Sequence, residues 1–285
     1  MNSKRRKSSN KGKAPFRHKK SLGQNFLCDD AIIEAIVDST KADDRTLVVE
    51  IGPGEGALTT KLVERAGRVA AIELDDRLIP ILHTMFALHD NFRLIHEDIL
   101  QVDLAALTEE EMREHGLEHL AVVGNLPYYI TTPIIMHLLE AEIPYRSITV
   151  MMQKEVGERL LAEPGTRLAG AITHAVHYHC EVSKVCDVPR TAFNPPPKVD
   201  SMVLRLNRRE HPPIETADAD FYFRCIKAGY ALRRKTLPNA LAAMEGVTRE
   251  QIGRALEEAN IDASRRAETL SMEEFARLAD CLREE

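Results

Sequence analysis

Residues 46–56 read Thr-Leu-Val-Val-Glu-Ile-Gly-Pro-Gly-Glu-Gly, an apolar segment that runs directly into a loop rich in glycine. Glycines at such a point allow the backbone to turn sharply and to approach a nucleotide closely at the start of the next helix. Glu73 ends the next apolar segment, about 20 residues further on, where an acidic side chain can accept hydrogen bonds from ribose hydroxyls. The pattern predicts a nucleotide-like ligand in contact with Gly52, Gly54 and Glu73.

The loop by itself fits a nicotinamide dinucleotide and S-adenosylmethionine equally well. Two details favour S-adenosylmethionine as the cofactor. The loop has the form Gly-x-Gly-x-Gly, and Glu55 puts a negative charge where a pyrophosphate would bind, whereas a sulfonium with a zwitterionic amino-acid end tolerates that charge. Asp98, after a third apolar segment, could accept a hydrogen bond from the cofactor's adenine amine, although a carboxylate in such a loop more commonly caps a helix.

Short apolar segments alternate with amphipathic ones along the first half of the chain, which predicts a parallel sheet covered by helices on both faces. We expect strands at 46–51, 68–73, 92–96, 120–125 and 147–152, and helices at 29–39, 57–65, 75–88, 132–139 and 154–162. Two later segments, 171–180 and 199–207, follow each other without a helical pattern between them. We expect both to be antiparallel edge strands.

The two ends of the chain have a different character. Residues 1–19 are rich in Lys and Arg and contain no acid, so we expect a disordered basic tail that suits a polyanion. Beyond residue 210 the sequence predicts only amphipathic helices, at 221–232, 249–259 and 272–282. The predicted organisation is therefore a tail over 1–19, a nucleotide-binding domain over 20–210 and a small helical domain over 211–285.

Composition excludes several classes of protein. The 285 residues are 44% hydrophobic and 29% charged, and no apolar run is long enough to span a bilayer. No signal-peptide pattern follows the start, so we expect a cytoplasmic protein with no membrane partner. The five cysteines form no Cys-x-x-Cys pair, which argues against a disulfide framework. His174, His177 and His179 fit no common zinc spacing in a segment with strand-like alternation, and we expect no metal site.

The segment Asn125-Leu126-Pro127-Tyr128 follows the fourth predicted strand, at the end of the sheet where such folds bind ligands. An exocyclic adenine amine is a poor nucleophile because its lone pair is delocalised into the ring. The side-chain oxygen of Asn125 and the carbonyl of Leu126 could each accept one N–H bond and favour a pyramidal nitrogen. Pro127 would stiffen the turn, and Tyr128 would stack on the base. The pattern predicts methyl transfer to an adenine amine, with catalysis resting on positioning and fixed dipoles.

Phe193 opens the segment Phe-Asn-Pro-Pro-Pro-Lys-Val, just before the last predicted strand. Its ring could cover the second face of an adenine that has been flipped out of its stack. A loop aromatic that covers an apolar edge is an equally good interpretation of the same residues.

Taken together, these motifs resemble those of the small-subunit ribosomal RNA adenine N6,N6-dimethyltransferases, the KsgA/Dim1 family. The matching segments follow the family's order over residues 20–241 and are Gln24–Leu27, Glu50–Gly56, Glu73, Glu97-Asp98, Asn125–Tyr128, Phe193–Ser201 and Arg233–Leu237. The resemblance implies an α/β fold, a Rossmann-like seven-stranded class I methyltransferase sheet with a small all-α C-terminal domain. It implies S-adenosylmethionine-dependent dimethylation of two adjacent adenosines near the 3′ end of 16S rRNA, by a monomer, within the small ribosomal subunit or its precursor.

Carried over by position, the resemblance assigns the cofactor to Asn25, Leu27, Gly52, Glu73, Asp98 and Asn125. It assigns the adenine to Asn125, Leu126 and Tyr128, with Phe193 as the second stacking face. The chain departs from the family at Ala169–Thr173 and at Pro238, positions that concern packing and RNA docking rather than methyl transfer. Two other functions stay open: a 23S rRNA adenine methyltransferase of the macrolide-resistance type, and a nucleic-acid-binding factor that has the fold without catalysis.

Overall fold

A computed structural model describes residues 25–232 and 234–284 of the chain. The predicted basic tail over 1–19 lies outside these residues, as do Gln24 and Arg233 of the family-like segments. None of the helices described is long and apolar enough to cross a membrane.

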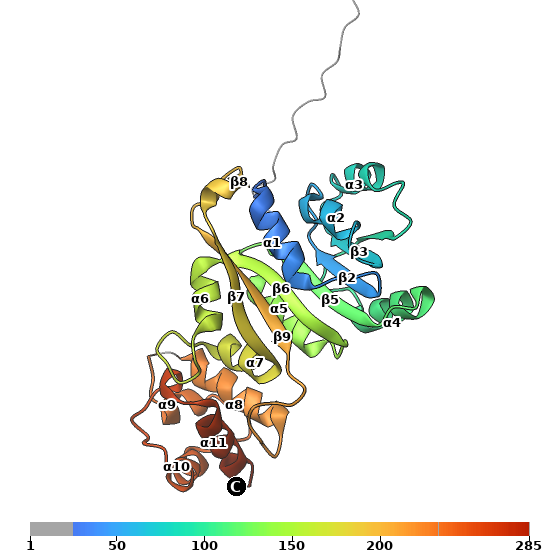
Figure 1. Ribbon diagram of the computed structural model, residues 1–285. Coiled ribbons are helices and arrows are strands. Elements are labelled where there is room, and N and C mark those ends of the chain that lie inside the picture. The colour runs from blue at the N-terminus through green and yellow to red at the C-terminus, as the bar shows by residue number, and fades with distance from the viewer. Residues whose placement is uncertain (1–24, 233, 285) are drawn as a thin grey trace, which may run out of the picture.

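Seven strands form one sheet in the order β4-β3-β2-β5-β6-β9-β7 (Figure 1). Five of them are mutually parallel: β2 (Thr46–Ile51), β3 (Arg68–Glu73), β4 (Phe92–His96), β5 (His119–Asn125) and β6 (Tyr145–Gln153). β9 (Ser201–Arg208) runs antiparallel to both of its neighbours, β6 and β7 (Cys180–Val188). The seven-stranded sheet is confirmed, but the predicted edge position of β9 is wrong, because this strand lies inside the sheet, between β6 and the edge strand β7.

The sheet is covered on both faces, as its buried strands require. Alternate side chains of β2 point to opposite faces of the sheet. On one face, Val48 packs with α1 (Asp30–Thr40), α2 (Ala57–Leu62) and α3 (Ile79–Met85). Leu47 and Val49 pack on the opposite side with α4 (Leu104–His115), α5 (Thr131–Glu140), α6 (Lys154–Leu161) and α7 (Ala171–His179). α3 is shorter than predicted, and Pro80 lies in its first turn, where a missing N–H costs no helical hydrogen bond.

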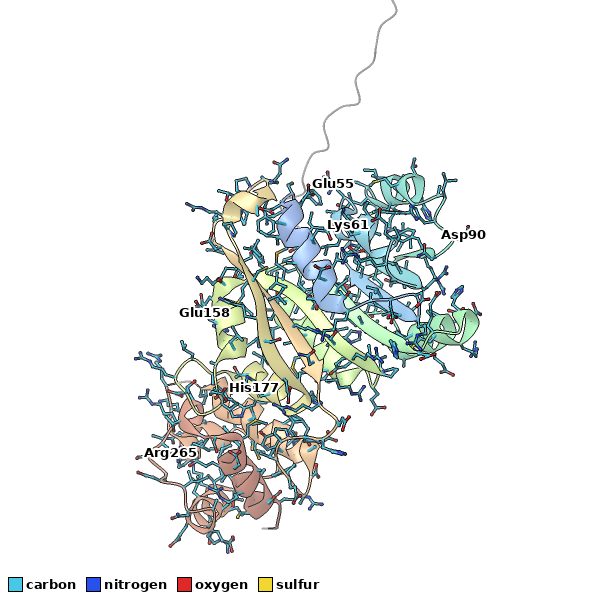
Figure 2. The ribbon with its side chains drawn as sticks, viewed as in Figure 1. Glu55, Lys61, Asp90, Glu158, His177 and Arg265 are labelled. Carbon is cyan, nitrogen blue, oxygen red and sulfur yellow. The ribbon has the colours of Figure 1, made fainter. Side chains whose placement is uncertain are left out.

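The prediction of a strand over 171–180 is wrong, because these residues form helix α7 and the strand begins only at Cys180. α7 is buried on several sides, between the sheet and the C-terminal helices, so its hydrophobic pattern carries no helical period. The histidines of this segment therefore lie on a helix, where each finds a protein partner. His177 Nε2 donates to the Leu160 carbonyl at 2.9 Å (Figure 2), and His174 Nε2 lies 3.1 Å from the Tyr230 hydroxyl.

Helix α4 has no counterpart among the predicted elements, since its polar sequence conceals its buried side. Asp103 caps it by accepting a hydrogen bond from the Ala106 N–H at 2.9 Å. Glu111 is only 1% exposed and pairs with Arg68 of β3 at 2.6 Å and with Arg93 of β4. A charged residue in this helix therefore faces the sheet edge instead of the solvent.

The C-terminal residues form helices α8 (Ala219–Ala231), α9 (Leu237–Leu241), α10 (Arg249–Glu258) and α11 (Met272–Glu284). They have their own hydrophobic cluster around Tyr222 and Phe275, and α7 lies between this cluster and the sheet (Figure 1). Pro238 lies in the first turn of α9, which accommodates this departure from the family pattern. The division into domains near residue 210 stays a prediction, in the connection between β9 and α8.

We expect Glu111→Ala to lower the free energy of unfolding by about 2–4 kcal/mol, because it leaves Arg68 partly buried without its anionic partner. Urea unfolding would measure the change. Glu109→Ala on the same helix is the matched control, since Glu109 is exposed and its ion pair with Arg113 is long, at 3.9 Å. It should stay within about 0.5 kcal/mol of wild type, and equal effects of the two substitutions would contradict a buried ion-pair role for Glu111.

Candidate active site

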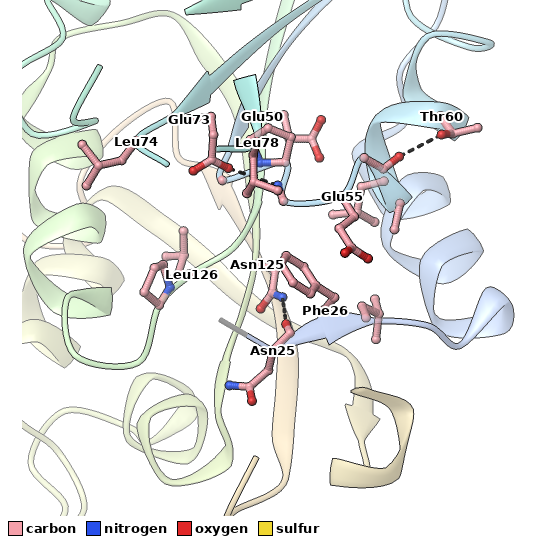
Figure 3. Close-up of a pocket in the computed structure, with 18 of the residues that line it drawn as sticks. Asn25, Phe26, Glu50, Glu55, Thr60, Glu73, Leu74, Leu78, Asn125 and Leu126 are labelled. Atoms are coloured by element: carbon pink, nitrogen blue, oxygen red, sulfur yellow. Dashed lines mark hydrogen bonds between the residues drawn. The ribbon is translucent and has the colours of Figure 1, made fainter. Parts of the chain in front are cut away.

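A pocket of about 410 Å³ lies at the carboxyl ends of β2, β3 and β5 (Figure 3). Three separate stretches of chain supply most of its wall: the short strand β1 (Phe26–Leu27) with Asn25, the glycine loop after β2, and the turn after β5. The complete lining is Asn25, Phe26, Leu27, Glu50, residues 52–58, Thr60, Glu73, Leu74, Leu78, Met85 and residues 125–129.

The glycine loop has a conformation that only glycine adopts without strain. Gly52, Gly54 and Gly56 have φ angles of 67°, 60° and 83°. A Cβ atom on Gly54 would also lie 3.0 Å from the ring of Phe26, which closes the pocket from the other side. The loop therefore brings bare backbone to the pocket surface, as a closely held ligand requires.

Glu73 lies at the end of β3 with its carboxylate against the glycine loop. One oxygen accepts a hydrogen bond from the Gly54 N–H at 3.2 Å and the other from the Asp75 N–H at 2.8 Å. Burial raises the pKa of Glu73, although these two N–H donors favour its charged form. The side chain is held as a fixed acceptor in the wall of the pocket, which is the position expected for a ribose ligand.

Glu50 precedes the loop and is buried, with only 1% of its surface exposed. Its Oε2 accepts a hydrogen bond from the Thr59 hydroxyl at 2.6 Å, while its buried Oε1 has no partner among the residues described. Burial, together with the smaller effect of the nearby Glu73 carboxylate, raises the pKa of Glu50 to about 7. A cationic group in the pocket would supply the counter-charge that this carboxylate lacks.

The turn after β5 presents the predicted amine-binding oxygens. Asn125 Nδ2 donates to the Asn25 carbonyl at 3.2 Å, a contact that fixes the side-chain amide and leaves Oδ1 as its acceptor end (Figure 3). Leu126 is anchored through its N–H to the Met151 carbonyl at 3.1 Å. Within the described chain, no donor reaches the Leu126 carbonyl oxygen. Both atoms therefore remain able to accept a hydrogen bond from a ligand.

Tyr128 is half-buried, and its hydroxyl lies 2.7 Å from the hydroxyl of Ser201 at the start of β9. This bond joins the turn to β9 and fixes the orientation of the aromatic ring. Burial raises the pKa of Tyr128, so the phenol stays neutral at physiological pH.

Two predicted site residues do not line the pocket. Asp98 accepts a hydrogen bond from the Leu100 N–H at 3.0 Å, so in this structure its carboxylate caps the turn after β4. Phe193 is 4% exposed and packs in the hydrophobic core, paired with Leu27 across the ladder between β1 and β8 (Phe193–Asn194). In this structure the ring covers an apolar space beside β1, and its role as a second stacking face stays a prediction.

The sequence interpretation missed three apolar residues of the pocket wall, namely Leu74, Leu78 and Met85. Leu74 and Met85 are each 48% exposed, so they offer accessible apolar surface to a ligand in the pocket. The position of Leu74 directly after Glu73 is a signal that could have identified it. Met85 reaches the pocket from the end of α3, which no local pattern reveals.

Comparison with known proteins agrees with this geometry. The model of the ribosomal RNA adenine dimethylase family matches residues 15–284. The chain belongs to this family. One curated relative in the family, the ribosomal RNA small subunit methyltransferase A of Geobacillus thermodenitrificans, is 50% identical over 270 residues, which cover 94% of this chain and 92% of that protein.

Solved structures of dimethylase-like proteins share the fold. A dimethyladenosine transferase from Plasmodium falciparum has a TM-score of 0.72 at 25% identity, covering 89% of this chain and 95% of that one. The 23S rRNA methyltransferase ErmE has a TM-score of 0.67 at 28% identity, covering 91% of this chain and 100% of that one. The predicted class I methyltransferase sheet with a helical C-terminal region is confirmed.

The buried carboxyl of Glu50 gives this dimethylase family member a pH-dependent stability. The folded chain holds the Glu50 proton more tightly than the unfolded chain does, because the pKa of this carboxyl has its ordinary value of 4.5 when the chain is unfolded. The resulting contribution to the free energy of unfolding is fully present below pH 4.5 and is lost as the pH rises through 7. At pH 8 we expect Glu50→Gln to be more stable than wild type by up to about 3 kcal/mol, measured by urea unfolding of the ligand-free protein.

The same comparison at pH 4.5 should show a much smaller difference between Glu50→Gln and wild type. Glu55→Gln, in the exposed part of the same loop, is the matched control and should follow the wild-type pH profile. A stability difference for Glu50→Gln that did not vary with pH would argue against titration of the buried carboxyl.

Proposed function

We propose that this protein uses S-adenosylmethionine to dimethylate N6 of two adjacent adenosines near the 3′ end of 16S rRNA. The reaction takes place in the small ribosomal subunit or its precursor and contributes to ribosome biogenesis. The observation that carries the proposal is that the Asn125–Tyr128 turn and the glycine loop with Glu73 share one pocket. Family membership and the 50% identity to a small subunit methyltransferase A support the choice of substrate.

The residues of the pocket suit this cofactor in three respects. The glycine loop has no side chains at Gly52 and Gly54, so a ligand can approach its backbone closely. The unpartnered buried Oε1 of Glu50 suits a ligand with a cationic end. Leu74, Leu78 and Met85 provide an apolar surface for a purine ring. Bound there, S-adenosylmethionine supplies an electrophilic methyl group, and Glu73 holds its ribose.

Asn125 and Leu126 act on the amine of the substrate adenine. In the first transfer each oxygen accepts one N–H bond, and in the second transfer one of them accepts the single N–H that remains. The nitrogen is thereby drawn out of conjugation and its lone pair is directed towards the cofactor side of the pocket. The ring of Tyr128, held by Ser201, stacks on the base, and Pro127 keeps the turn rigid. The amine proton becomes acidic as the new N–C bond forms, so positioning rather than a strong base drives the reaction.

The alternative substrate, an adenine of 23S rRNA, has less support. ErmE is 28% identical to this chain, whereas the small subunit relative from Geobacillus thermodenitrificans is 50% identical. A non-catalytic role would not require the two open acceptors of the turn. We propose further that the protein acts on the small subunit in the cytoplasm, as a monomer.

Mass mapping of methylated adenines in rRNA tests this proposal directly. In cells that lack the protein, two adjacent adenosines near the 3′ end of 16S rRNA should lose their N6 methyl groups, and the purified protein should restore them on isolated small subunits. Restoration on 23S rRNA instead would establish the alternative substrate, and no methylation of either RNA would favour a binding role.

Asn125→Ala tests the acceptor role. We expect turnover to fall by about 100-fold or more, the scale of losing one fixed dipole at a reacting group. The thermal midpoint should change little, since the Leu126 anchor to Met151 remains. Near-wild-type turnover would contradict the role of the side-chain oxygen.

A further inference from the structure

Tyr129 is the second aromatic residue of the turn after β5, and its surroundings differ from those of Tyr128. Both side chains line the pocket. Tyr128 is half-buried and bonded to Ser201, whereas Tyr129 is 61% exposed at the pocket mouth. A large aromatic surface held open to solvent beside a binding pocket is a surface that a ligand can cover.

The backbone around Tyr129 is fixed. The Pro127 carbonyl accepts hydrogen bonds from the Ile130 N–H at 3.1 Å and from the hydroxyl of Thr131 at 3.0 Å. Thr131 is buried at the first residue of α5, so the turn is tied to the helix. Tyr128 and Tyr129 occupy the tip of this closed turn. An aromatic ring on a rigid tip loses little conformational freedom when a base stacks on it.

We propose that Tyr129 stacks on the nucleotide that neighbours the adenine in the pocket, and so positions the RNA strand for methyl transfer. This inference rests on the proposed function. An adenine that enters the pocket leaves its neighbour without a stacking partner, at a cost in free energy. Tyr129 offers that neighbour a replacement, because aromatic side chains stack on bases of any sequence.

The division of labour between the two tyrosines follows from their positions. Tyr128 is tied to the start of β9 through Ser201, and it lies two residues after Leu126, whose carbonyl accepts the amine. Tyr129 follows it at the outer end of the same turn, where the RNA strand must continue into solvent. The inner ring therefore covers the target base, and the outer ring covers the next one along the strand.

The experiment uses small subunits whose 16S rRNA carries 2-aminopurine at one of the two adjacent adenosines. This base lacks an amine at C6, so the other adenosine is the target and the fluorescent base reports the neighbouring position. With the full-length protein and S-adenosylhomocysteine, wild type and Tyr129→Phe should keep the fluorescence quenched. Tyr129→Ala should raise it several-fold, because the base then has no aromatic partner.

On unlabelled subunits, Tyr129→Ala should raise KM by about 5- to 150-fold, the equivalent of one lost base stack, with little change in kcat or cofactor affinity. Tyr129→Phe should restore KM, because the ring and not the hydroxyl does the stacking. Leu88→Ala, which removes a side chain that is 94% exposed elsewhere on the surface, is the matched control and should behave as wild type.

Unchanged fluorescence and KM in Tyr129→Ala would overturn the inference. So would a fall in kcat alone with the neighbouring base still quenched, since that result would place the Tyr129 ring on the target adenine. A failure of the proposed function gives a different result, namely no methylation of small subunits by the wild-type protein.

Discussion

The site depends on the parallel pairing of β2 with β5. In this register Ile51 lies opposite Gly124, so the glycine loop and the Asn125 turn leave the sheet side by side. The two backbones approach so closely that a Cβ atom on Gly124 would lie 2.8 Å from the Ile51 carbonyl oxygen. The small residue at 124 thus permits the contact that joins the cofactor side of the pocket to the base side.

The parts of the fold that follow simple burial can be predicted from sequence. The bounds of β2, β3 and β4 are as predicted because each is a short strand-like segment between polar residues, and β2 and β3 are also buried on both faces. α4 and α7 fail for opposite reasons. α4 hides a buried Glu111 in a polar sequence, and α7 is surrounded by protein, so neither shows the one-sided pattern of a surface helix.

The candidate site divides in the same way. Gly52, Gly54, Glu73 and Asn125 follow strands directly, and the topology of a parallel sheet brings such positions to one edge. The positions of Phe193 and Asp98 could not be predicted from the sheet topology. The surroundings of Phe193 are set by its pairing with Leu27, and those of Asp98 by a local turn. Local sequence shows which residues end a strand, but it does not show which way a loop side chain turns.

The two-residue ladder between β1 and β8 has a consequence for biosynthesis. It joins the segment that precedes the first strand of the large sheet to the segment that precedes β9. Leu27 pairs with Phe193, and the Cys28 N–H donates to the Ala192 carbonyl. Asn25, whose carbonyl orients the Asn125 side chain, directly precedes β1 of this ladder. A nascent chain that has emerged only as far as β6 already contains the glycine loop and the Asn125 turn. The β1–β8 ladder that holds the remaining pocket wall in place can form only after residues 192–194 have left the ribosome.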